Sequence, residues 1–365
     1  MKRPLLLPLV PLYAAGLAMR EMRLERGWEK VQRLPWPVIS VGNLSTGGSG
    51  KTPMVIALAR LLTARGFRVD VLSRGYGRRS GVPLRVDCSG TAEEFGDEPL
   101  LIAREAGVPV YVAAERYEAG QLAEAELSLT GAKAPFFSGD SLARLKSCPD
   151  TNLTALGELT KPHSFRELHI LDDGFQHRQL ARDVDVLLVN REDWRDHLLP
   201  AGNLRESVQA VSRATVLAIP EEDAGFESEL RAWGWTGPVW RVRRRMEVPQ
   251  VDGPVVAFCG IARPEQFFEG LESAGLRLAM KKTFRDHYEY TEDVVDWLAV
   301  QARSARATAL ITTEKDAVRL QRLTSRLPAE LPLRTAGLRV EFVEEDALLD
   351  WIVARVDGTG MRAAL

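Results

Sequence analysis

The stretch from residue 38 to residue 62, "VISVGNLSTGGSGKTPMVIALARLL", constrains the fold more than any other part of the chain. It joins a short apolar run to a glycine-rich turn, after which Lys51 and Thr52 open a helical pattern. Glycines let backbone N–H groups converge on phosphate oxygens, and the helix N-terminus adds a favourable dipole. This order of strand, loop and helix predicts a phosphate-binding P-loop.

The predicted loop assigns nucleotide contacts to seven consecutive residues, namely Thr46, Gly47, Gly48, Ser49, Gly50, Lys51 and Thr52. Lys51 would reach the β- and γ-phosphates of ATP, and the Thr52 hydroxyl would bind Mg²⁺. Ser45 stands where the strict pattern has glycine, so the loop is a variant. One subfamily of dimeric switch ATPases carries an extra lysine where Thr46 stands, which argues against that subfamily.

An acidic partner for the loop follows a second apolar strand in "ELHILDDGFQH". The strand ends in Asp172 and Asp173, and a carboxylate at this place can hold Mg²⁺ directly or through water. Asp-Asp-Gly is also a common turn after a strand. The P-loop upstream favours the metal role, and the pattern leaves open which aspartate contacts Mg²⁺.

Phosphoryl transfer to an alcohol also needs a proton acceptor. Asp97 in "EFGDEPLLIA" lies at a predicted helix start, where it is a good N-cap. It could instead accept the proton of the attacking hydroxyl if a partner tunes it. His287 in "FRDHYEYT" is one candidate partner, although spacing alone does not join the two residues.

Strand and helix patterns alternate along most of the chain, which predicts an α/β fold with a doubly wound, mostly parallel sheet and a second, smaller α/β domain. At 365 residues, two domains are expected. The predicted division is an apolar N-terminal segment at 1–30, a P-loop core at 31–213 with an insertion at 131–166, a smaller domain at 214–344, and a C-terminal helix at 345–365 that packs back on the core.

Charge and cysteine content exclude several classes of protein. The net charge of −2 argues against nucleic acid as a partner. Cys88, Cys148 and Cys259 lie far apart without a CxxC or Cys/His pairing, which argues against a disulfide framework and a structural zinc site.

The N-terminus begins with Lys2 and Arg3 and then runs uncharged from Pro4 to Met19. Three interpretations compete: a signal peptide, a buried first helix, and a membrane-surface anchor followed by an arginine-rich helix. Export would separate an ATP site from its nucleotide, so the signal peptide is disfavoured. We favour the surface anchor over the buried helix.

Nine blocks of the sequence together resemble the tetraacyldisaccharide 4'-kinase family of the lipid A pathway. They occur in the family's order and span nearly the whole chain: "VGNLSTGGSGKTP", "SRGYGR", "GDEPLLIA", "AAERYEAG", "LDDGFQHRQLARDVDVLLVN", "LLPAGNLRE", "FCGIARPEQFF", "DHYEYT" and "TTEKDAVRL". The resemblance implies a Mg·ATP-dependent lipid kinase that phosphorylates the 4'-hydroxyl of tetraacyldisaccharide 1-phosphate. It also implies a P-loop core and a smaller domain with the site between them.

Carried over by motif, the resemblance implies a catalytic set of Asp97, His287, Lys51 and Asp173, with Asp97 as the general base. It implies a metal set of Thr52, Asp172 and Asp173, and His177 beside it. It further implies that the residues lining the substrate site are Arg74, Gln176, Arg205 and Glu206.

Two features depart from the family pattern. The segment 131–166 is longer than the family leads one to expect. The block "FCGIARPEQFF" has Ala262-Arg263 where relatives usually carry Gly-Asn or Gly-His, and the resemblance gives Arg263 no role.

A substrate with four acyl chains stays in a membrane, so the resemblance implies that the enzyme docks on the cytoplasmic face of the bacterial inner membrane. The docking would be peripheral or through the N-terminal segment. No protein partner is implied.

The alternative function is a P-loop regulatory NTPase or metallochaperone GTPase. A guanine-specific protein is expected to carry an NKxD-type motif that reads the base. The nearest match here is "TEKD", in which Glu314 replaces the asparagine and no residue separates Lys315 from Asp316.

Overall fold

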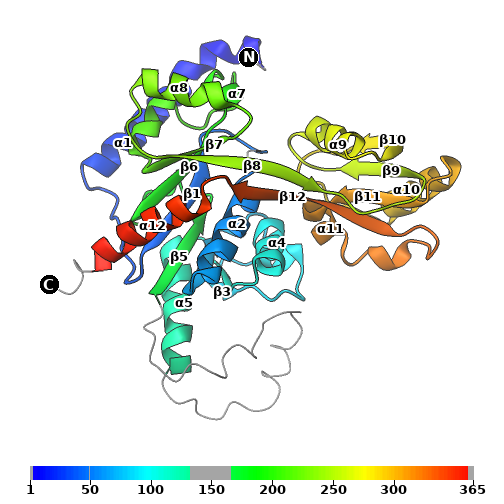
Figure 1. The fold of residues 1–365 in the computed structure, drawn as a ribbon, viewed down its shortest axis with the longest axis horizontal. Helices are drawn as coiled ribbons and strands as arrows, with labels where there is room; N and C mark the ends of the chain where they lie inside the picture. The colour runs from blue at the N-terminus through cyan, green and yellow to red at the C-terminus, as the bar shows by residue number, and fades with distance from the viewer. Residues whose placement is uncertain (1–2, 49, 132–165, 361–365) are drawn as a thin grey trace.

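The computed structural model describes residues 3–48, 50–131 and 166–360. The described strands form one twelve-stranded sheet in the order β10-β9-β11-β12-β8-β7-β6-β1-β5-β2-β4-β3 (Figure 1). The pairs are parallel except β3 with β4 and β12 with β8. The predicted α/β fold with a mostly parallel sheet is therefore confirmed. The predicted insertion at 131–166 lies outside the described residues over 132–165.

The larger lobe contains the first half of the chain (Figure 1). Its strands are β1 (Val38–Asn43), β2 (Phe67–Ser73), β3 (Leu84–Arg85), β4 (Val110–Val112), β5 (Arg166–Asp172), β6 (Val184–Leu188) and β7 (Val216–Pro220). Its helices are α2 (Lys51–Ala64), α3 (Ala92–Phe95), α4 (Asp97–Ala106), α5 (Arg116–Gly131), α7 (Arg191–Trp194), η3 (Val208–Arg213) and α8 (Ala224–Trp233). Strand β1 lies between β5 and β6, so the P-loop leaves the middle of this half of the sheet.

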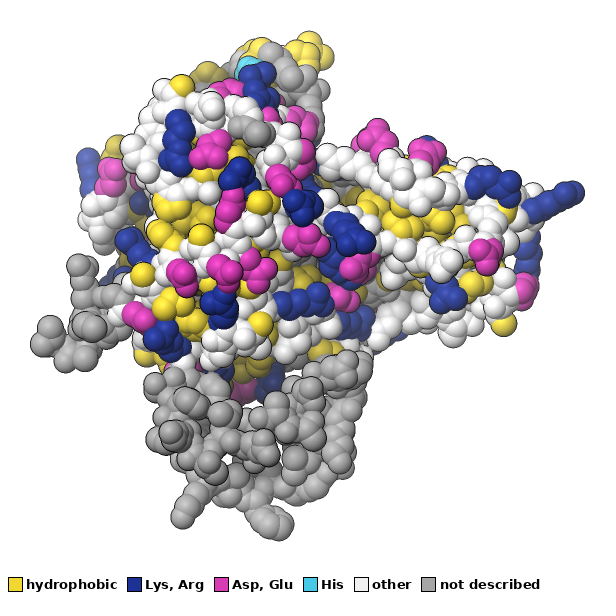
Figure 2. All heavy atoms as spheres, viewed as in Figure 1, with side chains coloured by type: hydrophobic (Ala, Val, Ile, Leu, Met, Phe, Trp, Pro, Cys, Tyr) yellow, Lys and Arg dark blue, Asp and Glu magenta, His cyan; other side chains and the backbone are white. Residues whose placement is uncertain are grey.

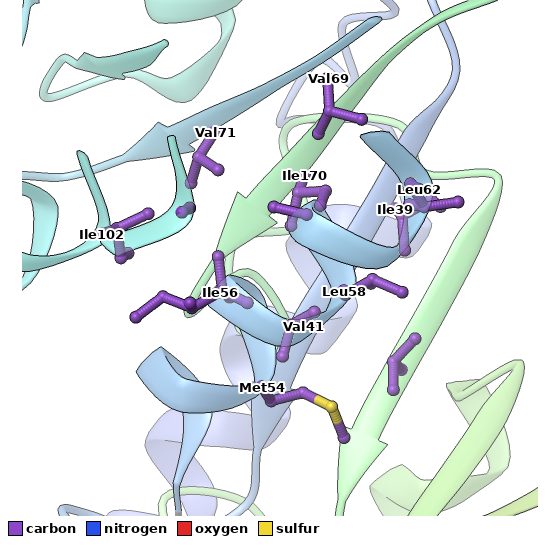
Figure 3. Packing of buried hydrophobic residues seen from close by; sticks show 14 of the residues in the cluster. Ile39, Val41, Met54, Ile56, Leu58, Leu62, Val69, Val71, Ile102 and Ile170 are labelled. Carbon is purple, nitrogen blue, oxygen red and sulfur yellow. The ribbon is translucent and has the colours of Figure 1, made fainter. Parts of the chain in front are cut away.

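Helix α2 is fixed to the sheet by an apolar face. Met54, Leu58 and Leu62 recur every fourth residue, which places them on one side of the helix, and all three are fully buried. They pack in one cluster with strand residues such as Val41 and Ile170 (Figure 3). This burial holds the N-terminus of α2 at the end of β1, where the P-loop must turn.

The smaller lobe repeats the alternation of strand and helix. It comprises β9 (Pro254–Cys259), α9 (Pro264–Ser273), β10 (Arg277–Thr283), α10 (Glu292–Ser304), β11 (Ala309–Thr313), α11 (Glu314–Leu320), η4 (Thr324–Arg326) and β12 (Leu333–Phe342). An aromatic group around the buried Phe258, with Phe284 and Tyr290, packs under its strands.

Two long antiparallel strands link the lobes (Figure 1). Strand β8 (Val239–Glu247) pairs with β7 in the larger lobe and with β12. The chain thus passes from the larger to the smaller lobe along β8. Helix α12 (Glu345–Gly360) then contributes Leu349 and Ile352 to the same core cluster as α2. The domain boundaries at 30, 213 and 344 stay predictions.

The N-terminal helix lies on the surface. A 3₁₀ turn, η1 (Pro4–Leu9), continues into α1 (Val10–Glu25), and neither has a buried residue, which rules out the buried-first-helix interpretation. The Tyr13 hydroxyl donates to the carbonyl oxygen of Arg205 at 2.9 Å, and the Arg20 guanidinium donates to that of Gln176. Helix α1 is therefore attached by polar contacts to the segments that carry two predicted site residues.

Charged side chains of both signs are intermingled over both lobes on the face drawn in Figure 2. Among the described residues on that face, neither sign of charge forms a continuous stripe.

Candidate active site

The P-loop connects β1 to α2 through three glycines in the left-handed region. The φ angles of Gly47, Gly48 and Gly50 are 74°, 60° and 84°, which disfavour any residue with a Cβ atom. Thr46 is fixed by its backbone N–H, which donates to the carbonyl oxygen of Asn203 at 2.8 Å. Of the seven predicted nucleotide contacts, six lie on this turn or on the first turn of α2, and Ser49 lies outside the described residues.

Lys51 and Arg205 converge on the same two oxygen-bearing side chains. The Lys51 ammonium donates to Asn43 Oδ1 at 2.9 Å and lies 3.4 Å from Asp173 Oδ1. The Arg205 guanidinium donates to both Asp173 oxygens, at 2.9 and 3.0 Å, and to Asn43 Oδ1 at 2.6 Å. Burial would raise the pKa of Asp173, but Lys51 and Arg205 outweigh it and hold that pKa well below its usual range.

Asp172 lies beside this cluster in a different electrostatic environment. It is buried at the end of β5, level with Val41 of β1, and accepts a hydrogen bond from the Ser73 hydroxyl at 2.9 Å. Burial, with the negative charges of Glu98 and Asp173, raises the pKa of Asp172 to about 7. The two neighbouring aspartates therefore differ in protonation near neutral pH.

The donor set fits Mg²⁺ bound together with a nucleotide. Among the described residues no group of three or more His, Cys, Asp and Glu side chains could hold a metal alone. Mg²⁺ rarely uses such a cage, and is commonly held by one or two carboxylates, a hydroxyl and the phosphates themselves. Thr52 in the first turn of α2, with Asp172 and Asp173 at the end of the neighbouring strand, supplies this set.

Asp97 and His287 meet across the two lobes. Asp97 is buried at the start of α4, and its Oδ2 lies 3.2 Å from His287 Nδ1. His287 has a φ of 55°, which is uncommon for a residue with a side chain, and its ring lies edge-on to that of Tyr76. The structure thus brings together two residues that sequence spacing could not join.

Sequence reasoning missed two further cations on Asp97, both from α11. Arg319 donates to Asp97 Oδ2 through Nε at 2.9 Å and through a terminal nitrogen. Lys315 lies 3.9 Å from the same oxygen and donates to Glu98 Oε1 at 2.9 Å. Burial would raise the pKa of Asp97, but the hydrogen bond with His287 and the charges of Lys315 and Arg319 hold it well below its usual range.

The signal for these cations was present in "TTEKDAVRL". Lys315 and Arg319 are four residues apart, so both side chains lie on one face of the helix. Asp316, which the GTPase interpretation needed for base reading, is fully buried and accepts from the Gly260 N–H at 3.0 Å and from Arg319 at 2.9 Å. It is therefore occupied inside the smaller lobe and is not placed to read a guanine.

The other predicted lining residues are Gln176, Glu206 and Arg74. Gln176 donates to the carbonyl oxygen of Asn43 at 2.9 Å, and the buried Glu206 pairs with Arg213. Arg74 is exposed at the end of β2. Burial, and the nearby charges of Arg116 among others, lower the pKa of His177 to about 4, so its ring is neutral at pH 7.

Arg116 is another residue that motif reasoning did not single out, although its block "AAERYEAG" was recognised. It is buried at the first position of α5, and its Nε atom has no hydrogen-bond partner. Burial lowers its pKa, and the charge of Arg74 lowers it further, while Asp172 and Asp173 act in the opposite direction. A buried cation thus faces the acidic cluster.

The fold and this site define a P-loop phosphotransferase, because a phosphate loop, an acidic strand end and a carboxylate–histidine pair lie together at the carboxyl ends of parallel strands. Within that class, the chain belongs to the tetraacyldisaccharide-1-P 4'-kinase family, whose model matches residues 2–357.

Named relatives and a solved structure agree with this assignment. The chain is 37% identical to the tetraacyldisaccharide 4'-kinase of Koribacter versatilis over 361 residues, which cover 96% of this chain and 98% of the relative. It is 35% identical to the kinase of the same name from Aquifex aeolicus, covering 88% and 91%. The crystal structure of LpxK from Aquifex aeolicus in complex with ATP superposes with a TM-score of 0.70 at 32% identity, covering 97% and 99%.

Proposed function

We propose that the chain transfers the γ-phosphoryl group of ATP to the 4'-hydroxyl of tetraacyldisaccharide 1-phosphate, a step of lipid A biosynthesis. The observation that carries the proposal is the joining of Asp97 and His287 across the lobes, beside a P-loop, in a chain that matches the kinase family over 2–357. The charge of Glu98, next to Asp97, helps to raise the pKa of Asp172, so the two parts of the site interact electrostatically.

In the proposed reaction the bond between the γ-phosphorus and the bridging oxygen of ATP breaks and ADP leaves, while the acceptor oxygen bonds to phosphorus. Mg²⁺, held by Thr52 and the aspartates, would neutralise the phosphate charge. Lys51 and Arg205 now contact Asn43 and Asp173, and the Lys51 ammonium would turn to the phosphates when ATP binds. Asp97 would take the proton of the hydroxyl.

We expect Mg²⁺ binding in the presence of ATP to weaken below about pH 7. Asp172 has its pKa raised to about 7, and a carboxyl group must lose its proton before it can ligate a metal. The apparent dissociation constant should rise by up to about tenfold per pH unit on the acid side and level off above pH 8. Calorimetry in buffers of different ionisation enthalpy measures the proton released.

The variant Asp172→Asn separates this proton from those of the nucleotide itself. It should bind Mg²⁺ more weakly and release fewer protons at pH 7 than the unmodified chain. An unchanged proton count in Asp172→Asn would contradict the assignment of the titration to this residue.

The membrane part of the proposal rests on α1 and the turn before it. Leu5 and Leu12 are 93% and 74% exposed, and Met19 is exposed as well. The helical stretch Pro4–Glu25 is long and apolar enough to cross a membrane, a test that signal sequences also pass. We place the enzyme on the cytoplasmic face of the inner membrane, where ATP is present, with this surface against the lipid.

We expect Leu5→Glu and Leu12→Glu to lower binding to phospholipid vesicles by at least about tenfold each, since burying one leucine contributes roughly 1.5–3 kcal/mol. Flotation of the full chain with vesicles of phosphatidylethanolamine and phosphatidylglycerol measures it. Val300→Glu is the matched control, because Val300 is 54% exposed on helix α10 of the smaller lobe. Equal binding of all three variants would refute this docking surface.

The direct test of the proposed activity is labelled ATP with tetraacyldisaccharide 1-phosphate, followed by chromatography of the lipid. Labelled lipid should form only when the acceptor and Mg²⁺ are present. Tight GTP binding without lipid labelling would instead support a regulatory NTPase.

A further inference from the structure

The turn that follows β9 in the smaller lobe lies against the phosphate loop. A Cβ atom built on Gly48 would lie 2.9 Å from Arg263 Cγ and 3.2 Å from Arg263 Nε, and one built on Gly47 would lie 2.8 Å from the Cβ of Ala262. The glycines therefore have two roles in this loop. They allow the backbone turn that phosphate binding needs, and they leave room for Ala262 and Arg263 to lie directly against the loop backbone.

The guanidinium of Arg263 is held in this position by the larger lobe. One terminal nitrogen donates to Asp193 Oδ1 at 3.0 Å, and the other lies 3.3 Å from Glu192 Oε2. The Arg263 side chain is 15% exposed and that of Asp193 is 8% exposed, so this ion pair is largely removed from water. A buried pair with good geometry fixes orientation more strongly than a surface pair.

Asp193 also contacts the start of the phosphate loop, so it links Arg263 to Ser45. Its second oxygen, Oδ2, accepts from the Ser45 hydroxyl at 2.8 Å, and Ser45 in turn accepts from Asn43 Nδ2 at 3.0 Å. Ser45 is the residue that replaces the usual first glycine of the motif. Two departures of this sequence, Ser45 and Arg263, therefore meet at one buried carboxylate.

We propose that Arg263 is a positioning residue of the nucleotide site, which braces the phosphate loop from the smaller lobe through Asp193 and Ser45. The brace spans the loop from Ser45 to Gly48, so it holds the backbone N–H groups in the arrangement that phosphate oxygens need. The inference rests on the proposed nucleotide site, but not on the identity of the lipid acceptor.

The test compares Mg·ATP binding and steady-state kinetics in Arg263→Gln, Arg263→Lys and Asp193→Asn. Arg263→Gln should raise the dissociation constant for Mg·ATP and the KM for ATP by about tenfold, because the charge-assisted hydrogen bond that braces the loop is lost, while the KM for the lipid stays unchanged. Arg263→Lys keeps the charge without the planar fork and should recover part of the affinity. Asp193→Asn should also weaken Mg·ATP binding.

The matched control is Arg243→Gln, an exposed arginine on β8 that pairs with Glu221 at 2.7 Å and should leave ATP binding unchanged. Arg263→Gln binding ATP as tightly as Arg243→Gln would overturn the inference. Equal losses for ATP and lipid, with no recovery in Arg263→Lys, would also overturn it, because they indicate general damage to the fold. Lys51→Ala is measured in parallel: if it binds Mg·ATP normally, the proposed nucleotide site itself fails.

Discussion

Replacing Asp97 by asparagine should lower kcat by roughly 10²–10³-fold and leave the dissociation constant for Mg·ATP within about twofold. The amide keeps the shape of the side chain but cannot accept the proton of the hydroxyl. The three basic groups near Oδ2, from His287, Lys315 and Arg319, keep the pKa of Asp97 well below its usual range. A weak base gains less in the transition state, which places the expected loss in the lower part of the range for base catalysis. Single-turnover kinetics with labelled ATP measures it.

His287→Ala supplies the partner test. If the two side chains act as one unit, the double variant should be little slower than the slower of the two single variants. Losses that simply multiply would show that His287 does not act through Asp97. Unchanged kcat in Asp97→Asn would remove the proposed base altogether.

The acidity of Asp97 also bears on the pH dependence of the reaction. Its pKa is depressed, so the carboxylate stays ionised throughout the physiological range and is protonated only in strong acid. If activity falls as the pH drops below neutral, we expect the cause to be Asp172, whose pKa is raised to about 7, and not Asp97. The surroundings of the two carboxyl groups shift their pKa values in opposite directions. Asp97 is surrounded by cations, whereas Asp172 is buried beside anions.

The parts of the site that sequence predicted are those encoded within one short segment. The P-loop is recognisable because strand, glycine turn and helix start are contiguous, and the apolar face of α2 fixes the turn at the end of β1. The acidic pair Asp172–Asp173 follows the same logic at the end of β5. The parallel pairing of β1 with β5 then brings the two segments together, as an α/β sheet requires.

The parts that sequence missed are set by how the lobes meet. Arg319 lies 222 residues from Asp97, and no local pattern specifies which carboxylate its guanidinium will reach. Asn43 shows the same limit at short range. It is buried at the end of β1 and reads as one more strand residue until Lys51 and Arg205 are seen to share its oxygen. Helical spacing places Lys315 and Arg319 on one face of α11. Only the packing of the lobes determines that both lie near Asp97.

The second large effect is expected at Lys51. Its ammonium lies at the N-terminus of α2, 2.9 Å from Asn43 Oδ1 and 3.4 Å from Asp173 Oδ1, and is poised to exchange these oxygens for those of ATP. Lys51→Ala should lower kcat/KM for ATP by roughly 10²–10³-fold, since a cation aimed at charge that develops in the transition state is lost. Arg205 lies on the same oxygens and cannot compensate, because both of its terminal nitrogens are engaged by Asp173. Lys51→Arg, which keeps the charge but not the compact ammonium, is the matched variant and should be intermediate. Steady-state kinetics over ATP concentration measures both, and a Lys51→Ala enzyme with normal kcat/KM for ATP would refute the role given to the loop.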